Sequence, residues 1–352
     1  MPGKSEPNLF QAGAGKVVIT PPVGFVISGP EHSERVSTGI ADDLLARVIV
    51  LESQGNRIAL ISLDVWGLAK SILDSIKLAI TVSTHIPEDS IWLTVTGNGT
   101  APPLWRDEPL YANYTAYLPE QVNGAVQAAL RSMEPASMGS AGILLPEVST
   151  FIDGPGLPGN PALFVVAINR ADGTGIARLM NFACPATITG PSTMWTADYP
   201  GYACWALEQN GAGLSLFSQA PSHDIRPFDW WIQNTDPTHS ARNPKDVHAF
   251  GLLLATQADN AAAETVQRRN VEIAIRSDEA TTIQVLRVGD AFFISTNKPQ
   301  PNKFARRLRR HFPQSNTIVT ANLSGGLFDA KATFDPRGVK RSIALLNELG
   351  AT

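Results

Sequence analysis

The sequence predicts a mixed α/β fold, with mixed β-sheets flanked by helices. Two observations support this prediction. Pairs of apolar strands joined by a short turn are followed by an amphipathic helix and a further buried strand, and this order occurs more than once along the chain. In addition, 43% of the 352 residues are hydrophobic and 17% are charged, which is enough apolar material for a large core. Strands and helices that alternate in this way pack as layers of helix against sheet.

The first unit of this kind lies in the N-terminal third of the chain. Short apolar runs predict strands at 16–20, 45–52 and 57–64, and the turn "SQGN" joins the last two into a hairpin. Apolar residues at helical spacing predict a helix within 69–86 that lies on this sheet. A buried strand at 91–95 follows and ends abruptly in a loop of glycine, asparagine and proline that contains no His, Cys, Asp or Glu.

The second unit has the same parts. Two alternating strands surround the turn "NRADGTG" within 162–178, and a helix at 201–209 and a strand at 214–220 follow. Loops at strand ends are where α/β proteins commonly place binding and catalytic residues. We therefore expect the loops after the strands of each unit to face one common cleft.

The third unit contains a hairpin within 281–296, a helix within 303–312 and a strand that ends in a glycine loop. Phe304, Leu308 and Phe312 lie four residues apart, which predicts one buried helix face and leaves the arginines of "RRLRRH" on the solvated faces. Because the order of elements repeats that of the first unit, an internal duplication is one explanation.

Charge and cysteine content argue against several classes of protein. A net charge of −4 and a pI of about 5.9 give no electrostatic footprint for nucleic acid. The N-terminus lacks a secretory signal and no apolar run approaches the roughly 18 residues of a membrane span, so we expect a cytoplasmic protein without membrane insertion. Cys184 and Cys204 are too few for a disulfide framework and lie in apolar surroundings, so we expect them to be reduced, buried and structural.

Six short segments, taken together, point to a known family. They read "AGAGKVVITPPVG" (12–24), "GIADDLLARVIVLE" (39–52), "ALISLD" (59–64), "NFAC" (181–184), "ADYPGYA" (197–203) and "VLRVGDAFF" (285–293). In this order they resemble the neutral/alkaline, non-lysosomal ceramidase family, whose catalytic domain is an α/β fold with an active-site zinc. The resemblance implies a short, bacterial, intracellular member with a single domain across 1–352, of which 1–11 is a flexible N-terminal segment.

The zinc-binding positions implied by the resemblance carry no ligand in this chain. Where the family has Thr-His-Thr-His-Ser-Gly-Pro, this chain reads "TGNGTAP", so that Gly97 and Gly99 replace two histidines. The resemblance also aligns Pro185 with a third ligand, Pro299 with a glutamate and Leu327 with a tyrosine. Because zinc is held by His, Cys, Asp or Glu side chains, we expect no zinc and no cofactor.

A replacement metal site has one candidate cluster, His239, Asp246 and His248. The same segment also reads as the start of a helix, with Asn243 as its cap and Pro244 at the first helical position. We favour the helix start and keep the metal site as the alternative.

The loop after 214–220 gains a titratable group where other loops lack one. It reads "QAPSHDIRP", and the resemblance places His223 where the family has a glycine, beside the retained Asp224. Because histidine can act as a general acid or base near neutral pH without a metal, His223 and Asp224 are the candidate catalytic residues. A hydrogen-bonded loop histidine is the structural alternative for His223.

Polar, aromatic and guanidinium groups close to these loops suit a small organic anion or another small polar ligand. The candidate substrate-binding residues are Asn98, Thr100, Trp105, Arg106, Ser222 and Arg226. For Trp105, packing in the core is the alternative.

Two functions of different class follow from these patterns. The first, which we favour, is a diverged ceramidase-like protein that acts as a metal-independent hydrolase on a small polar substrate such as an amide. The second is a catalytically inactive pseudoenzyme that binds a ligand or partners an active homologue. The expected partner is a small-molecule ligand, with neither nucleic acid nor an inserted membrane; a homo-oligomer and a complex with a zinc-bearing homologue stay open.

Overall fold

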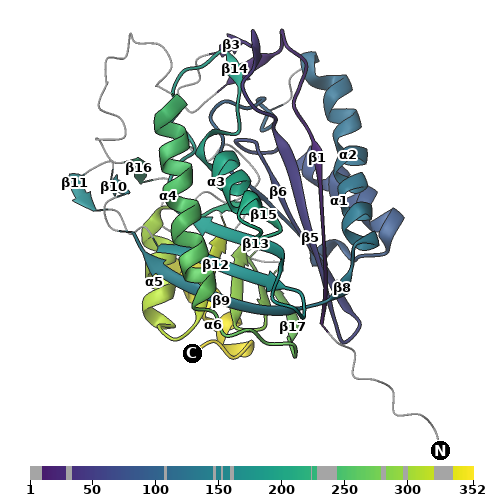
Figure 1. Ribbon diagram of the computed structural model, residues 1–352, viewed down its shortest axis with the longest axis vertical. Helices are drawn as coiled ribbons and strands as arrows, with labels where there is room; N and C mark the ends of the chain where they lie inside the picture. Colours follow the sequence, from purple (N-terminus) through teal and green to yellow (C-terminus); the bar gives the residue numbers. More distant parts are fainter. Residues whose placement is uncertain are drawn as a thin grey trace, which may run out of the picture.

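The computed structural model describes residues 10–28, 34–106, 109–145, 148–151, 154–158, 162–222, 224–227, 244–278, 283–295, 300–320 and 336–352. Mixed β-sheets flanked by helices make up these residues, which confirms the predicted fold class. Figure 1 shows α1 and α2 on one side of the first sheet, and α3 and α4 over the second.

The first unit is a sheet covered by two helices. Its elements are, in chain order, β1 (Gln11–Val18), β5 (Leu45–Ser53), β6 (Asn56–Leu63), α1 (Lys70–Thr84), β7 (Ile91–Val95) and α2 (Ala112–Arg131). Strands β1, β5 and β6 are antiparallel neighbours, and α1 carries the chain back so that β7 runs parallel to β6. The short β8 (Glu134–Pro135) extends the sheet beyond β1. The predicted hairpin, helix and returning strand are confirmed.

The second unit repeats this topology. Its elements are β9 (Ser137–Leu144), β12 (Ala162–Asn169), β13 (Gly175–Phe182), α3 (Asp198–Gln209), β15 (Leu214–Gln219) and α4 (Pro244–Ala263). The sheet order is β15-β13-β12-β9, and only β13 and β15 are parallel. Helix α4 begins at Pro244, as the helix-start pattern predicted.

The third unit has the same order again. Its elements are β17 (Ile273–Asp278), β18 (Ile283–Val288), β19 (Ala291–Ser295), α5 (Asn302–His311), β20 (Asn316–Thr320) and α6 (Pro336–Glu348). The sheet order is β17-β18-β19-β20, with β19 and β20 parallel. Each unit is thus three antiparallel strands, a helix, a parallel strand and a second helix. The repeated order suspected from the sequence is therefore present in the topology, in three units instead of two.

Short elements lie between the main strands and helices of the first and second units. Strands β2 (Val26–Ser28) and β3 (Glu34–Val36) pair with each other, β4 (Gly39–Ile40) pairs with β14 (Met194–Trp195), and β10 (Ser149–Phe151) lies between β11 (Gly154–Pro158) and β16 (Ile225–Pro227). Two short 3₁₀ helices, η1 (Glu88–Ser90) and η2 (Pro109–Tyr111), precede β7 and α2.

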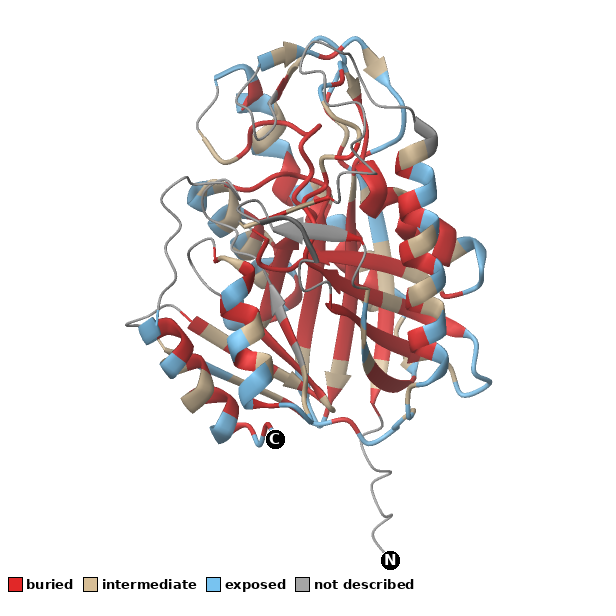
Figure 2. Ribbon diagram, turned by 90° about the vertical axis from the view of Figure 1, so that its left-hand side faces the viewer, coloured by how far each residue is buried: buried red, intermediate tan, exposed pale blue. Residues whose placement is uncertain are grey.

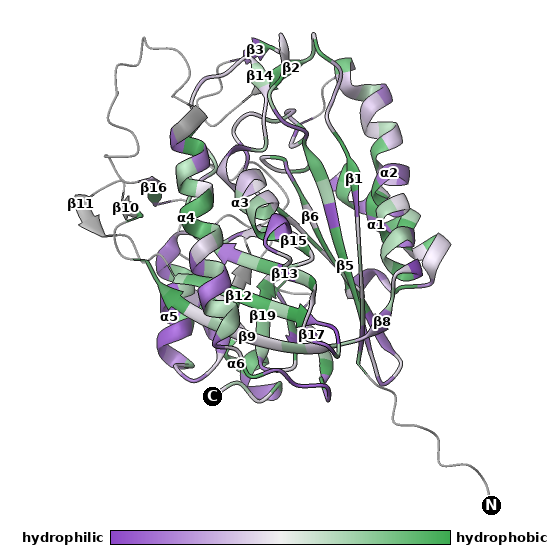
Figure 3. Ribbon diagram, in the orientation of Figure 1, coloured by the Kyte–Doolittle hydropathy of each residue, from purple (hydrophilic) through white to green (hydrophobic). Residues whose placement is uncertain are grey.

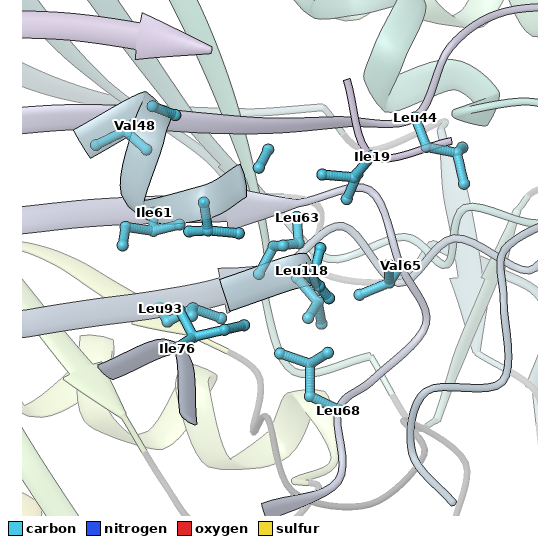
Figure 4. Close-up of a cluster of buried hydrophobic side chains, with 14 of the residues drawn as sticks. Ile19, Leu44, Val48, Ile61, Leu63, Val65, Leu68, Ile76, Leu93 and Leu118 are labelled. Atoms are coloured by element: carbon cyan, nitrogen blue, oxygen red, sulfur yellow. The ribbon is translucent and has the colours of Figure 1, made fainter. Parts of the chain in front are cut away.

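Successive side chains of each strand point to opposite faces of the sheet, so the apolar residues contribute to two kinds of core: one under the helices and one on the opposite face. In β5, Val48 and Val50 face α1 and α2, whereas Ile49 and Leu51 face the other way, because successive strand residues point to opposite faces. Figure 4 shows Val48 and Ile61 among the side chains gathered between sheet and helices. The second and third units have their own helix-covered cores of the same kind.

The inner faces of all three sheets share one further core, which we call the central core. It includes Leu51 from the first sheet, Phe164 from the second and Phe293 from the third. The rings of Trp92 and Phe293 meet edge to face with centroids 6.3 Å apart. Figure 2 shows the strands almost entirely in the colour of buried residues, whereas the helices are buried on one side only. The central core therefore joins the three units.

Strand β1 differs from its predicted bounds of 16–20, because it occupies Gln11–Val18. The cause is the "AGAG" run, which reads as a loop but lies under α2. A Cβ atom on Gly13 would stand 2.1 Å from the carbonyl oxygen of Ala129, and one on Gly15 would stand 2.3 Å from that of Ala125. Glycine is used here for close approach of strand and helix and not for a turn.

Helix α5 buries Phe304, Leu308 and the following Phe312, as predicted. One of its arginines departs from the prediction of solvated arginines. Arg309 lies with its guanidinium carbon 4.4 Å from the centroid of the Phe164 ring. Burial lowers the pKa of Arg309 to about 9. Of the four arginines in α5, Arg309 therefore points inward, and the other three remain on the outer side.

Cys184 and Cys204 are both buried and not joined in a disulfide, which confirms their predicted state. Burial raises the pKa of Cys204 to about 12 and that of Cys184 well above its ordinary value. Neither thiol is therefore a ready nucleophile. No described helix combines the length and apolar character needed to cross a lipid bilayer.

Candidate functional site

The parallel strands of the first two units end next to each other. Thr94 near the end of β7 and Ser218 near the end of β15 bring their hydroxyl oxygens within 3.2 Å. Asn181 of β13 donates from Nδ2 to the carbonyl of Ser218 at 3.1 Å. The loops that follow β7, β13 and β15 consequently leave the sheets from neighbouring positions, as expected for the ends of parallel strands.

The loop after β7 is tied to the loop after β13 through Asn98. This side chain is fully buried, donates from Nδ2 to the carbonyl of Thr196 at 2.7 Å, and accepts the backbone N–H of Thr100 at 2.9 Å. The Thr100 hydroxyl oxygen lies 2.8 Å from both Asn98 Oδ1 and the Thr196 carbonyl. The N–H of Gly99 donates to the carbonyl of Ala186 at 3.0 Å. The polar groups of Asn98 and Thr100 are thus directed into the protein.

A buried ion pair lies next to the same loop, since Asn98 Nδ2 is 3.4 Å from the carbonyl oxygen of Asp64. Asp64 follows β6, and its Oδ2 lies 2.6 Å from Arg47 Nη1, with both side chains almost completely buried. The same oxygen accepts the N–H of Leu45 at 2.9 Å. The free-energy cost of removing each charge from water is offset in part by the opposite charge of its partner.

Asp198 holds the start of α3 in place. Its Oδ2 accepts the N–H of Thr189 at 2.8 Å and its Oδ1 accepts the N–H of Tyr199 at 2.7 Å. Burial raises the pKa of Asp198, and these two hydrogen bonds oppose that shift. Asp198 also has φ of 54°, a left-handed conformation that aspartate and asparagine adopt more readily than other non-glycine residues.

Three of the positions that the family resemblance aligns with zinc ligands lie in these loops. Gly97, Gly99 and Pro185 have no donor atoms in their side chains. The two nearby buried carboxylates, Asp64 and Asp198, are engaged by Arg47 and by backbone N–H groups. Within the described part of the chain, no group of three or more His, Cys, Asp or Glu residues could hold a metal ion. Pro299 and Leu327 lie outside the described residues.

The alternative metal cluster is not assembled by the residues that can be placed. His248 stacks on the ring of Tyr202, with centroids 4.2 Å apart. Asp246 lies two positions earlier on the same helix, and residues at that spacing do not face each other. His239 lies outside the described residues.

The loop after β15 meets the third unit. Gln219 donates from Nε2 to the hydroxyl oxygen of Ser222 at 2.6 Å, and both residues are buried. Asp224 Oδ1 accepts the N–H of Asn302, the first residue of α5, at 2.6 Å. Asn302 in turn donates from Nδ2 to the carbonyl of Pro221 at 3.1 Å. A carboxylate at this end of α5 also complements the helix dipole. His223, between Ser222 and Asp224 in the chain, lies outside the described residues.

The other candidate binding residues lie on separate elements. Trp105 is half-buried and packs against the core of the first unit, as in the alternative interpretation. Arg106 forms an ion pair with Glu34 of β3. Arg226 lies in β16, opposite Thr150 of β10. Phe228 and the tryptophans that follow it lie outside the described residues.

Several residues of this region were not singled out from the sequence. Thr196 supplies the carbonyl that binds Asn98, and Asp42 accepts the Thr196 hydroxyl at 2.6 Å and the N–H of Ala197 at 2.7 Å. Asn302 links the second and third units. Polar residues at the edges of apolar runs, such as Asp42 in "GIADDLL" and Asp64 in "ISLD", were the available signal.

Comparison with known proteins identifies the fold. No family model and no curated protein matches the chain. Among solved structures, the neutral ceramidase from Pseudomonas aeruginosa is similar with a TM-score of 0.73 and 14% sequence identity, over 90% of this chain and 67% of that one. A ceramidase complexed with C2 is similar with a TM-score of 0.72 and 13% identity, over 89% and 68% of the two chains. The protein therefore has a neutral ceramidase-like fold.

Proposed function

We propose that this chain is a hydrolase-type enzyme that acts without a bound metal on a small polar substrate, with amides as the first class to test. The observation that supports it best is the contact between the loop after β15, which contains Ser222 and Asp224, and the start of α5 in the third unit. The ceramidase-like fold supports a hydrolase, because the similar solved structures are ceramidases, and a ceramidase is a hydrolase.

His223 is the proposed general acid and base. It would take a proton from the water molecule that attacks the substrate carbonyl, and return a proton to the nitrogen that leaves. Asp224 would stabilise the charged imidazolium, since a carboxylate has two oxygens and one of them accepts the Asn302 N–H. Zinc chemistry has no part in this proposal, because the described residues of the region offer no fitting set of ligands.

The test combines metal analysis with hydrolysis of small acyl amides. We expect turnover that EDTA leaves unchanged, and zinc well below one atom per chain. His223→Ala should lower kcat by roughly 10²- to 10⁴-fold, and the wild-type pH profile should show a limb near a histidine pKa of about 6.5. His248→Ala, which removes the exposed histidine that stacks on Tyr202, is the matched control and should keep full activity. Stoichiometric zinc together with loss of turnover in EDTA would refute the proposal.

A second function, a catalytically inactive protein that binds a ligand through other residues or partners an active homologue, is favoured by one specific observation. Asn98 and Thr100 direct their polar groups to each other and to the Thr196 carbonyl, so they contribute to the structure of the loop. In the same amide screen, a compound that raises Tm equally in the wild type and in His223→Ala, with no turnover by either, would support this function and exclude the first.

A further inference from the structure

Three asparagines of this chain are followed directly by glycine: Asn98, Asn123 and Asn210. In such a pair the backbone nitrogen of the glycine can attack the side-chain Cγ of the asparagine and close a five-membered succinimide ring. The new N–Cγ bond replaces the Cγ–Nδ2 bond, and the proton of the glycine N–H leaves with the amide nitrogen as ammonia. Water then opens the ring to aspartate or isoaspartate. Glycine favours this reaction because it has no side chain to hinder the ring and its backbone rotates freely.

The fold holds two of these pairs in place. Asn98 is fully buried in the hydrogen bonds described above, and the N–H of Gly99 donates to the carbonyl of Ala186 at 3.0 Å. Asn123 lies inside α2, so the nitrogen that would attack it is part of the helical backbone. Its Oδ1 also accepts the hydroxyl of Ser83 in α1 at 2.7 Å. Ring closure at either position therefore requires the surrounding structure to open first.

The third pair lies in a different setting, directly after the last residue of α3. Asn210 and Gly211 are both exposed, and Gly211 has φ of 86°, which glycine adopts without strain. A Cβ atom placed on Gly211 would have none of the described residues within 4 Å, apart from its two chain neighbours. Figure 3 shows that α3 becomes hydrophilic toward its end. Water therefore has access, and the ring has room to form.

The attacking nitrogen of this pair is also the most easily released. The N–H of Gly211 donates to the carbonyl of Glu208 at 3.2 Å, in the last turn of α3. Hydrogen bonds at helix ends open more readily than those inside a helix, because the ends fray. The same sequence pair is thus buried in one place, inside a helix in the second, and at an exposed helix end in the third.

We propose that Asn210 is a site of spontaneous modification, at which the folded protein slowly exchanges a neutral amide for a carboxylate. The amide joins α3 to α4, because Nδ2 of Asn210 donates to Oδ2 of Asp259 at 3.2 Å. In the aspartate product two carboxylates face each other at this position and repel. The new charge also lies at the C-terminal end of α3, where the helix dipole disfavours anions. The modification therefore removes a contact between α3 and α4 and adds one negative charge to the net charge of −4.

The experiment keeps the full chain at pH 8.5 and 37 °C in water enriched in oxygen-18, and follows the three asparagines by peptide mapping and mass spectrometry. Each ring opening adds one labelled oxygen, which distinguishes new product from product present at the start. In the folded protein we expect Asn210 to convert at least 10-fold faster than Asn98 or Asn123. In guanidinium chloride, where the fold no longer protects any of them, the three should convert at similar rates.

Variants test the consequence for the contact between α3 and α4. Asn210→Asp carries the aspartate product from the start and should have a lower Tm than the wild type, and adding Asp259→Asn should restore part of the loss. Asn210→Gln keeps the amide but cannot close the five-membered ring, so it should not convert over the same period.

The rates in the folded wild type decide whether the site is correctly assigned. Conversion of Asn98 or Asn123 as fast as that of Asn210, or conversion of Asn210 only after unfolding, would overturn the proposal. A Tm of Asn210→Asp equal to that of the wild type would refute the loss of the contact with Asp259. Because mass and Tm are the readouts, the result is independent of hydrolysis and of His223.

Discussion

The first and third units share a strand order but differ in what their helices show to solvent. Helices α1 and α2 expose apolar side chains, including Leu78, Val82 and Tyr117, which are 56%, 68% and 62% exposed. Helix α5 instead exposes cations, among them Lys303, Arg307 and Arg310. On the inner side both units bury apolar residues against their own sheet. The inner faces therefore specify the shared topology, while the outer faces are free to differ.

The largest expected effect on stability concerns the buried ion pair of the first unit, for which the third unit has a more exposed counterpart. Arg47→Ala should lower the free energy of unfolding by about 3–5 kcal/mol, because Asp64 would be left buried without its counter-charge. Glu272→Ala removes the partner of Arg287 in the third unit, where the glutamate is 57% exposed, and should cost less than about 1 kcal/mol. Urea unfolding of the two variants measures the difference. Similar losses in both would contradict this contrast between the units.

The inner faces of α1 and α5 should contribute similar amounts to the free energy of unfolding. Ile76→Ala in α1 and Leu308→Ala in α5 each remove a fully buried side chain, and each should cost about 2–5 kcal/mol. Arg310→Ala on the outer face of α5 should stay within about 0.5 kcal/mol of the wild type. The measurement is the midpoint of thermal or urea unfolding. A cost for Arg310→Ala as large as that for Leu308→Ala would show that an exposed cation of α5 helps to hold the helix in place.

The smallest expected effect is a pH dependence that arises from Asp198. Burial raises the pKa of Asp198 in the folded state above the value of about 4 of an unfolded chain. Between these two pKa values the folded protein binds more protons than the unfolded one, so stability contributed by this group is present at low pH and is lost as pH rises through the folded pKa.

Asp198→Asn keeps a residue that tolerates positive φ and removes the titration. The stability of the wild type relative to this variant should therefore decrease as pH is raised from 4 toward neutrality. Unfolding in urea at several pH values measures this change, and the same substitution at the exposed Asp74 of α1 supplies the baseline. An increase with pH would mean that the hydrogen bonds from Thr189 and Tyr199 outweigh burial.

The sequence predicted those elements whose pattern depends on local alternation. The hairpin of β5 and β6 and the buried face of α5 follow from the spacing of apolar residues. Helix α2 was missed because Pro119 lies inside it, and proline usually ends a helix. The true extent of β1 was missed because its glycines fit against α2, a contact between residues more than 100 positions apart.

Contacts between loops of the candidate region were predictable from the sequence, whereas the direction of their side chains was not. Loops at strand ends were expected to meet, and the loops after β7 and β13 do so through Asn98 and Gly99. Asn98 was expected to bind a ligand, yet its amide is engaged by Thr196, about 100 residues later in the chain. Which way a loop side chain points depends on such distant partners, and a local pattern does not contain them.

The central core has a consequence for the nascent chain on the ribosome. The first unit can cover one face of its sheet once α2 has been made, but the opposite face, with Trp92, waits for Phe293 and Ile318 of the third unit. At synthesis rates of about 5–20 residues per second, the interval between residues 92 and 318 lasts roughly 10–45 s. During that time the part of this apolar sheet surface that packs on the third unit lacks its partner. Molecular chaperones that hold such surfaces should therefore associate with the growing chain before the third unit emerges.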